Sequence, residues 1–98
     1  MFVSKIVWTN AAREDVQALK LHFIGREGKR GVERLKLRIA DQLSLIQHFP
    51  LIGMANPDRK RIRKFFLDDY YDIVYEPRPE LIVIHAILPK WKQHWTGI

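Results

Sequence analysis

The densest concentration of possible binding chemistry in this chain is the run Arg59-Lys60-Arg61-Ile62-Arg63-Lys64, with five positive charges in six residues. Guanidinium and ammonium groups at this density bind phosphate groups or carboxylates. A cluster of basic residues that binds nucleic acid has the same composition as one that binds an acidic protein, so both interpretations stay open. A second basic region, residues 26–38, is offset by Glu27 and Glu33 and has the character of a solvated helix face.

Histidine is the other side chain of possible chemical interest. His85 lies in the nearly apolar segment Leu81–Leu88, where a lone histidine is more often a packed residue than a catalytic one. No two histidines have the i, i+4 spacing of a helical metal site, and no glycine-rich phosphate loop or nucleophile motif occurs. The chain has no cysteine, which excludes disulfides and cysteine metal sites. We therefore expect no metal and no cofactor.

Size and composition place limits on the class of protein. The 98 residues allow one domain with one core, over residues 1–98. The net charge of +6 and the pI near 9.9 favour an acidic partner, with solubility alone as the simpler reading. No apolar run approaches the roughly 18 residues of a membrane helix, and the N-terminus lacks the features of a secretory signal. We expect a cytoplasmic protein that does not interact with membranes.

Two helices are expected to position these groups. Ala12, Val16, Leu19 and Phe23 recur with helical spacing, and so do Val32, Leu35, Ile39, Leu43 and Ile46. Thr9 or Asn10 is the predicted N-cap, and the helical region ends near His48 because Phe49-Pro50 follows. The polar, glycine-containing segment Arg26–Gly31 predicts a tight connection, so the two helices form a hairpin.

The remaining segments alternate in the manner of strands. Strands are predicted over Phe2–Trp8, Arg61–Leu67, Tyr71–Glu76 and Leu81–Leu88, with a loop over Leu51–Asp58, turns at Asp68-Asp69 and Pro77–Glu80, and a short helix in the tail. Leu81–Leu88 is apolar on both faces, which predicts a place in the middle of the sheet. The order is β-α-α-β-β-β, an α+β fold in which the helical hairpin packs on a small, mostly antiparallel sheet.

An ordered set of features over residues 3–95 resembles the RelE/ParE toxin superfamily, often called plasmid-stabilisation proteins. In chain order the features are Trp8-Thr9 with Ala12, Asp15 and Val16; Phe49-Pro50 with Gly53; Arg63 ahead of Tyr71-Asp72-Ile73-Val74-Tyr75; and Ile84-His85-Ala86-Ile87-Leu88 running into Lys92-Gln93 and a tryptophan. The resemblance implies a small basic toxin held inactive by a cognate antitoxin. RelE-like members cut messenger RNA on the ribosome without a metal, whereas ParE-like members block DNA gyrase.

Metal-free RNA cleavage needs a base, an acid and cations around the phosphorus. Arg63 matches the strand arginine of the family, but it is equally interpreted as an exposed strand arginine or one that pairs with the antitoxin. His85 and Lys92 are the other catalytic candidates, although a packed histidine and a solvated tail lysine are the simpler interpretations. At the end of the last strand, where ribonuclease members often carry a basic residue, this chain has Pro89. The sequence therefore favours the ParE-like reading, with a RelE-like ribonuclease as the alternative.

Two groups of binding residues follow from the charge pattern and the resemblance. The predicted target- or nucleic-acid-binding residues are Arg59, Lys60, Arg61, Arg63, Lys64, Lys90 and Lys92. The predicted antitoxin-binding residues lie off the helix core stripe or in the tail: Leu37, Leu45, Trp91 and Trp95. For Leu37, packing at the edge of the core is the alternative interpretation. The oligomeric state is left open.

Overall fold

The computed structural model describes residues 4–92 and has one mixed sheet with a bent helix on it. The elements in chain order are β1 (Lys5–Trp8), α1 (Asn10–His48), β2 (Met54–Ala55), β3 (Arg63–Phe66), β4 (Tyr71–Arg78), β5 (Leu81–Pro89) and the 3₁₀ helix η1 (Lys90–Lys92). The expected α+β order is confirmed, with β2 as an additional strand. The predicted antitoxin contact Trp95 lies outside the described residues.

The strand order in the sheet is β1-β5-β4-β3-β2, with β1 parallel to β5 and every other pair antiparallel. The apolar strand β5 is internal, as predicted, because its lack of a polar face requires cover on both sides. The loop predicted over Leu51–Asp58 is wrong in part, since Met54 and Ala55 pair with Lys64 and Arg63. A two-residue strand is too short to show a sequence alternation, so only its partner strand reveals it.

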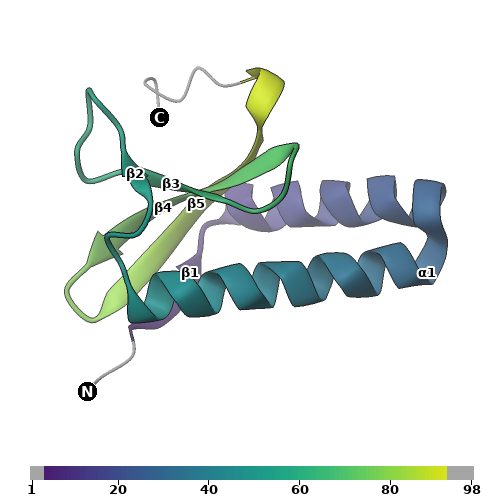
Figure 1. The fold of residues 1–98 in the computed structure, drawn as a ribbon, viewed down its shortest axis with the longest axis horizontal. Helices are drawn as coiled ribbons and strands as arrows, with labels where there is room; N and C mark the ends of the chain where they lie inside the picture. Colours follow the sequence, from purple (N-terminus) through teal and green to yellow (C-terminus); the bar gives the residue numbers. More distant parts are fainter. Residues whose placement is uncertain (1–3, 93–98) are drawn as a thin grey trace.

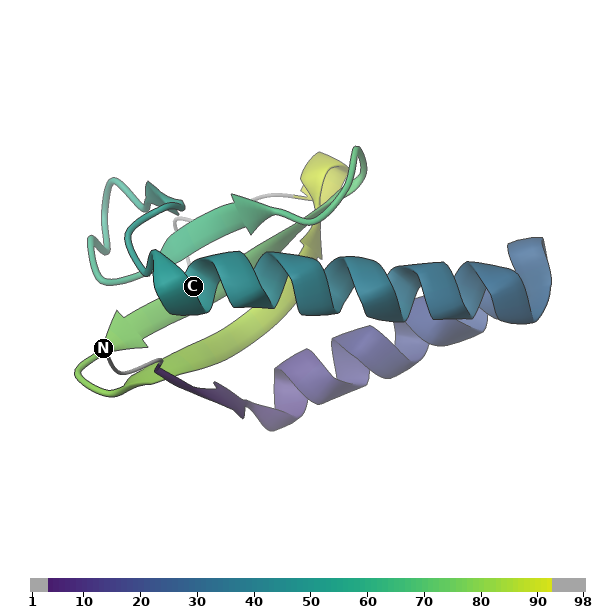
Figure 2. The same cartoon turned by 60° about the horizontal axis from the view of Figure 1, so that its bottom comes forward.

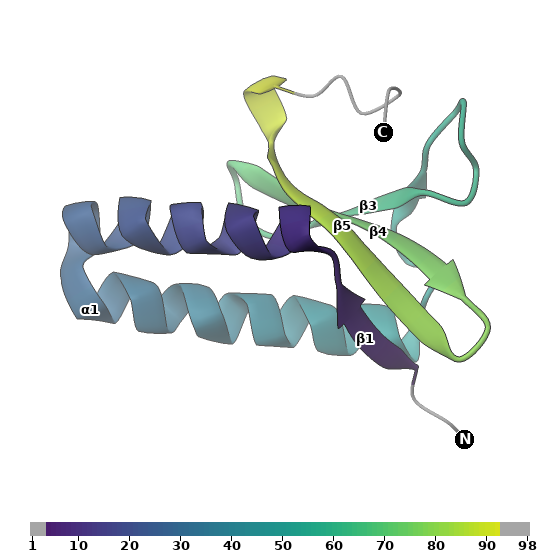
Figure 3. The ribbon, with the colours of Figure 1, turned by 180° about the vertical axis from the view of Figure 1, so that it is seen from behind.

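The helical hairpin packs on one face of the sheet, as Figures 1, 2 and 3 show from three sides. The predicted six-residue connection Arg26–Gly31 is wrong in extent, because helical backbone continues on both sides of a single residue, Gly28, with φ 70° and ψ −160°. That conformation is open essentially to glycine alone. Thr9 is the N-cap and its hydroxyl accepts the Ala12 N–H at 3.1 Å.

The main core lies between the hairpin and the sheet. It joins residues of both helical arms to residues of β4, β5 and the β3–β4 turn, and its members are Ala12, Leu19, Leu35, Ile39, Ile46, Leu67, Ile73, Tyr75, Ile82, Ile84 and Ile87. Every predicted member of the two helical stripes is buried or half-buried. None of the helical segments within residues 4–92 combines the length and the apolar character that a bilayer crossing needs.

A β-bulge in β5 changes which residues share a face. Val74 pairs with Ala86 and Tyr75 pairs with Ile84, so His85 has no partner on β4. Strict alternation along Leu81–Leu88 predicts that His85 and Ile87 share a face, and this is wrong. Ile87 packs in the main core, whereas His85 turns to the opposite, outer face. Such an extra residue re-aims the side chains beyond it. A smaller cluster on the outer face contains Ile62, Val74, Ala86 and Leu88.

The ends of the strands also differ from expectation. Of the strand predicted over Phe2–Trp8, Phe2 and Val3 lie outside the described residues, and β1 covers Lys5–Trp8. β3 covers only Arg63–Phe66. β4 continues through Pro77 and Arg78, which pair with β5, so the turn predicted over Pro77–Glu80 contains only Pro79 and Glu80. The pairing of β3 with β4 ends at Tyr75, so Pro77 lies beyond the last residue of β4 that pairs with β3. Proline has no backbone N–H, and at this position no hydrogen bond to β3 is lost.

Candidate functional site

The loop between α1 and β2 is held by the side chain of Tyr75. This tyrosine is fully buried; its hydroxyl donates to the Pro50 carbonyl oxygen at 2.7 Å and accepts the Gly53 N–H at 2.9 Å. Burial raises the pKa of the Tyr75 phenol, so the hydroxyl stays protonated and able to donate. The residues Phe49-Pro50, Gly53 and Tyr75, far apart in the sequence, therefore come together as one structural unit.

Arg63 completes this unit from the neighbouring strand. Its Nη1 donates to the carbonyl oxygens of Leu51 at 3.1 Å and Gly53 at 2.7 Å. Arg63 pairs with Tyr75 across β3 and β4, so both side chains extend from the same face of the sheet. One nitrogen of Arg63, a predicted target- or nucleic-acid-binding residue, is thus engaged with the backbone of this chain.

The adjacent loop presents a rigid basic tip. Asn56 is fully buried, and its Oδ1 accepts the backbone N–H groups of Asp58 at 2.8 Å and Arg59 at 3.1 Å. The Ile62 N–H donates to the Arg59 carbonyl oxygen at 2.9 Å, which closes the loop. Asparagine side chains stabilise turns by accepting hydrogen bonds from the backbone a few residues further on, and this needs no pairing with another strand. The exposed residues Arg59, Lys60 and Arg61, which we call the basic tip, are therefore held on an ordered backbone.

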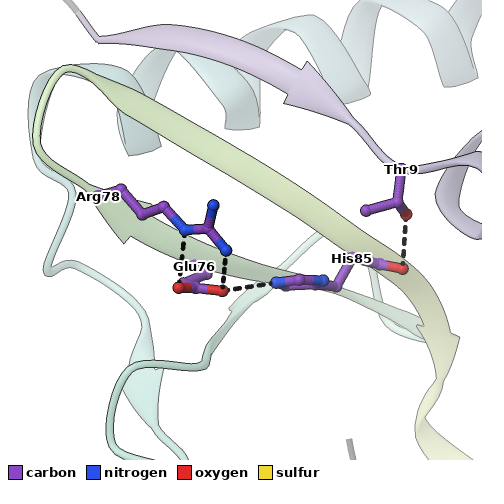
Figure 4. A network of polar contacts seen from close by, with 4 residues as sticks. All are labelled: Thr9, Glu76, Arg78 and His85. Carbon is purple, nitrogen blue, oxygen red and sulfur yellow. Dashed lines mark hydrogen bonds and ion pairs between the residues drawn. The ribbon is translucent and has the colours of Figure 1, made fainter.

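Next to the basic tip lies an ion cluster on the outer face of the sheet, drawn in Figure 4. The Glu76 carboxylate accepts from Arg78 Nε at 2.9 Å and Nη2 at 3.3 Å, and its Oε1 lies 2.9 Å from His85 Nε2. The hydrogen bonds from Arg78 hold the pKa of Glu76 below its usual value, against the opposing effect of burial. The cluster and the basic tip share an open concavity of about 580 Å³, lined by Arg59, Lys60, Arg61, Ile62, Glu76 and Arg78.

We predict that Glu76→Gln makes the stability of the protein less dependent on acid pH. A carboxylate whose folded-state pKa is lowered stabilises the fold above its unfolded pKa, and this contribution is lost as the pH falls through the folded pKa. At neutral pH the variant should lose about 1.5–3 kcal/mol, the range for hydrogen bonds to a charged group. The difference from the wild type should shrink below about pH 4. Urea unfolding at a series of pH values measures this.

The matched control is Glu33→Gln, which removes an exposed ion pair to Lys36. This change should alter the unfolding free energy by less than about 0.5 kcal/mol at any pH, because exposed pairs are weak. A Glu76→Gln protein whose stability follows the wild-type pH profile in parallel would contradict the role assigned to the carboxylate.

The three catalytic candidates do not form one site. Arg63 reaches toward the α1–β2 loop on the face that carries Tyr75. His85 bonds to Glu76, the residue after Tyr75, and so lies on the opposite face of the sheet. Lys92 belongs to a third location, a concavity of about 440 Å³ that also contains Asp15, His22, Tyr71 and Pro89. Arg63 and His85 are therefore separated by the sheet itself.

The other predicted cations are also distributed. Lys90 Nζ lies 3.0 Å from Asp72 Oδ1 and 4.8 Å from the centre of the Phe66 ring, so its charge is engaged within the fold. Lys64 is half-buried on β3 and has partners of its own. The predicted run of five charges is thus divided: the basic tip is exposed, and Arg63 serves a structural unit.

The predicted antitoxin contacts inside the described range are all exposed. Leu37 is 65% exposed and lies beside Arg38 on the second arm, and Leu45 is 40% exposed and lies near the end of α1. Trp91 is 65% exposed and packs against Tyr71, so the three residues lie at three different places. Their role stays a prediction. The sequence reading missed four further exposed side chains next to Leu45, namely Phe49, Leu51, Ile52 and Met54. These residues could have been found from the sequence, because large apolar residues in a loop that contains proline and glycine are expected to be exposed.

Solved structures show which class of fold this is. The chain is similar to a structure of the chromosomal ParDE toxin–antitoxin system from P. aeruginosa, with a TM-score of 0.72 and 19% identity over 89% of this chain and 96% of that one. It is also similar to the YoeB/ParE toxin from Agrobacterium tumefaciens, with a TM-score of 0.58 and 18% identity over 87% and 96% of the two chains. The fold is that of the RelE/ParE toxins.

The family is shown by the sequence itself. Residues 6–92 match the family described as the ParE toxin of the type II toxin–antitoxin system, parDE, and the chain belongs to this family. No match to a curated protein is found. The resemblance carried by the loop, the strand arginine and the final strand is therefore confirmed, and the protein is a toxin of the type II class.

Proposed function

We propose that this protein acts in the cytoplasm by binding an essential protein target, DNA gyrase, and that a cognate antitoxin neutralises it by binding. In this mechanism the toxin performs no bond-breaking step. The basic tip and the concavity beside it supply the positive surface, and electrostatic attraction accelerates encounter with an acidic or nucleic-acid-bound target. The family match and the fold support the toxin class on which this proposal is built.

The observation that carries the proposal is the separation of the catalytic candidates. General acid–base cleavage requires both groups within hydrogen-bonding reach of one phosphodiester. Arg63 and His85 extend from opposite faces of the sheet, and His85 is bonded to the Glu76 carboxylate. At the end of β5 the chain has Pro89, whose side chain can neither donate nor accept a proton. This arrangement supports a toxin that binds its target over one that cleaves RNA.

The alternative function is a RelE-like ribonuclease that cleaves messenger RNA at the ribosome. The basic tip is the feature that favours it, because three exposed cations on an ordered loop also suit a phosphate backbone. A ribonuclease would have to use the concavity on the outer face, where Arg78 supplies a positive charge and His85 is the candidate acid–base group.

The experiment compares inhibition of DNA gyrase supercoiling with cleavage of ribosome-bound message by the purified protein. We expect inhibition without cleavage. The triple variant Arg59→Ala/Lys60→Ala/Arg61→Ala should weaken inhibition by about tenfold, since removing charges around an interface lowers the association rate. The control Arg26→Ala/Lys29→Ala/Arg30→Ala removes the same charge from exposed positions near the hairpin bend and should leave inhibition unchanged.

Cleavage of message without inhibition of gyrase would replace the proposal by the ribonuclease alternative. Equal losses in the two triple variants would mean that only net charge matters and would remove the basic tip from the target-binding surface. Absence of both activities in the wild-type protein would contradict the proposal.

A further inference from the structure

Exposed apolar side chains are concentrated at the junction of α1 and β2. Of the twelve large apolar or aromatic side chains that are exposed within residues 4–92, five fall between positions 45 and 54. We call these five the loop platform; they are Leu45, Phe49, Leu51, Ile52 and Met54, with exposed fractions of 40–68%. Single exposed apolar residues are ordinary, but a group of them marks an interaction surface.

The five residues lie close together. The Phe49 N–H donates to the Leu45 carbonyl oxygen at 2.8 Å, which places these two residues one helical turn apart. The Ile52 N–H donates to the Phe49 carbonyl oxygen at 2.9 Å, so the chain folds back before β2 begins at Met54. Figure 2 shows this short connection between the end of the second helical arm and the sheet.

The platform is also held in place. Tyr75 and Arg63 together make four hydrogen bonds to the backbone of residues 50–53, from 2.7 to 3.1 Å. Gly53 packs so closely on this unit that an added Cβ would lie 2.7 Å from both the Lys64 carbonyl oxygen and the Tyr75 hydroxyl. Core residues therefore fix the backbone of a loop whose apolar side chains face water. Preorganisation of this kind reduces the ordering that a partner must impose.

The charge around the platform identifies the kind of partner. Residues 45–64 contain five Lys or Arg residues and one acidic residue, Asp58. A second copy of this chain would bring like charges together, and a nucleic acid would leave the apolar side chains uncovered. We propose that the loop platform binds an acidic polypeptide segment that carries large apolar side chains. Within the proposed function this segment belongs to the antitoxin, and that identification depends on the proposed function.

The test uses the full chain with two probes. The first is the product of the reading frame adjacent to the toxin gene, co-expressed with the toxin as the candidate antitoxin. The second is a short synthetic amphipathic peptide of leucine and glutamate, with a lysine-for-glutamate peptide and a single-stranded RNA as comparators. The variant Leu51→Ser/Met54→Ser should weaken antitoxin binding by about 30-fold, as expected for the loss of two apolar contacts at an interface. The control Leu21→Ser/Ile24→Ser changes two exposed residues of the first arm and should change the affinity less than threefold.

Amide chemical shifts locate the peptide. The glutamate peptide should shift amides within residues 45–64, and the lysine peptide should not. RNA binding at these amides, or a wild-type dimer that Leu51→Ser/Met54→Ser abolishes, would overturn the assignment. An antitoxin complex equally tight in this variant would overturn it while the proposed function stands. If no antitoxin complex forms but the glutamate peptide binds the platform, the proposed function fails and the platform stands. Binding of neither probe overturns the assignment.

Discussion

Replacing Gly53 by alanine is expected to lower the free energy of unfolding by about 3 kcal/mol, near the upper end for overpacking a filled site. An alanine Cβ would meet the Lys64 carbonyl oxygen, the Tyr75 hydroxyl and the Tyr75 ring at 2.7–2.8 Å. Two of these contacts are with a fully buried side chain and one is with the backbone of β3, so neither neighbour can move cheaply. The variant must also weaken the hydrogen bond from Gly53 N–H to Tyr75.

Urea unfolding followed by circular dichroism measures this effect, and Gly25→Ala is its control. Gly25 lies within the first helical arm, and nothing stands within 4 Å of its added Cβ. The control should be more stable than the wild type by about 0.5–1 kcal/mol, because alanine favours the helix. If Gly53→Ala unfolded at the wild-type urea concentration, the unit of Gly53, Arg63 and Tyr75 would not stabilise the fold as we describe.

The second large effect is expected from Gly28→Ala. At φ 70° and ψ −160° an alanine is strained by roughly 1–3 kcal/mol. Helical backbone on both sides of Gly28 offers the chain a way to relieve this strain, which is to continue as one straight helix. The first arm would then leave its own sheet and cover that of a second molecule, as in domain swapping. We expect lower monomer stability and a concentration-dependent dimer.

Size-exclusion chromatography with light scattering, at several protein concentrations, detects this dimer. Gly25→Ala again serves as the control, since it adds the same methyl group three residues earlier without strain. The control should behave as the wild type does in the same measurement. A Gly28→Ala protein that stays monomeric with unchanged stability would contradict the idea that this one residue bends the hairpin.

Much of the fold could be predicted because the information is local. The spacing of apolar residues from Ala12 to Ile46 identifies both helical arms and the faces they bury. The unbroken apolar run of β5 identifies an internal strand. The errors fall where a residue's state depends on a distant partner. β2 exists because β3 lies beside it, and the bulge at His85 follows from the pairing of β4 with β5.

For the candidate site too, local features could be predicted from the sequence and features that depend on distant residues could not. The density of positive charge at residues 59–64 and the stretch of apolar residues around Pro50 can be read directly from the amino acids. Side-chain direction cannot be read in this way, because it depends on which strand pairs with which and where the register shifts. Arg63 was a candidate for binding the target or nucleic acid and equally for a structural role, and only the structure shows that its Nη1 donates to the carbonyl oxygens of Leu51 and Gly53, ten or more residues away in the chain.

The sequence by itself determined that the protein is a small basic α+β protein of the toxin superfamily, because composition, periodicity and ordered motifs are properties of the chain alone. Only the tertiary structure decided that Arg63 and His85 face away from each other and that Tyr75 and Arg63 hold the backbone of the loop platform. The physical reason is that strand pairing and the hairpin bend bring together residues that no local pattern relates.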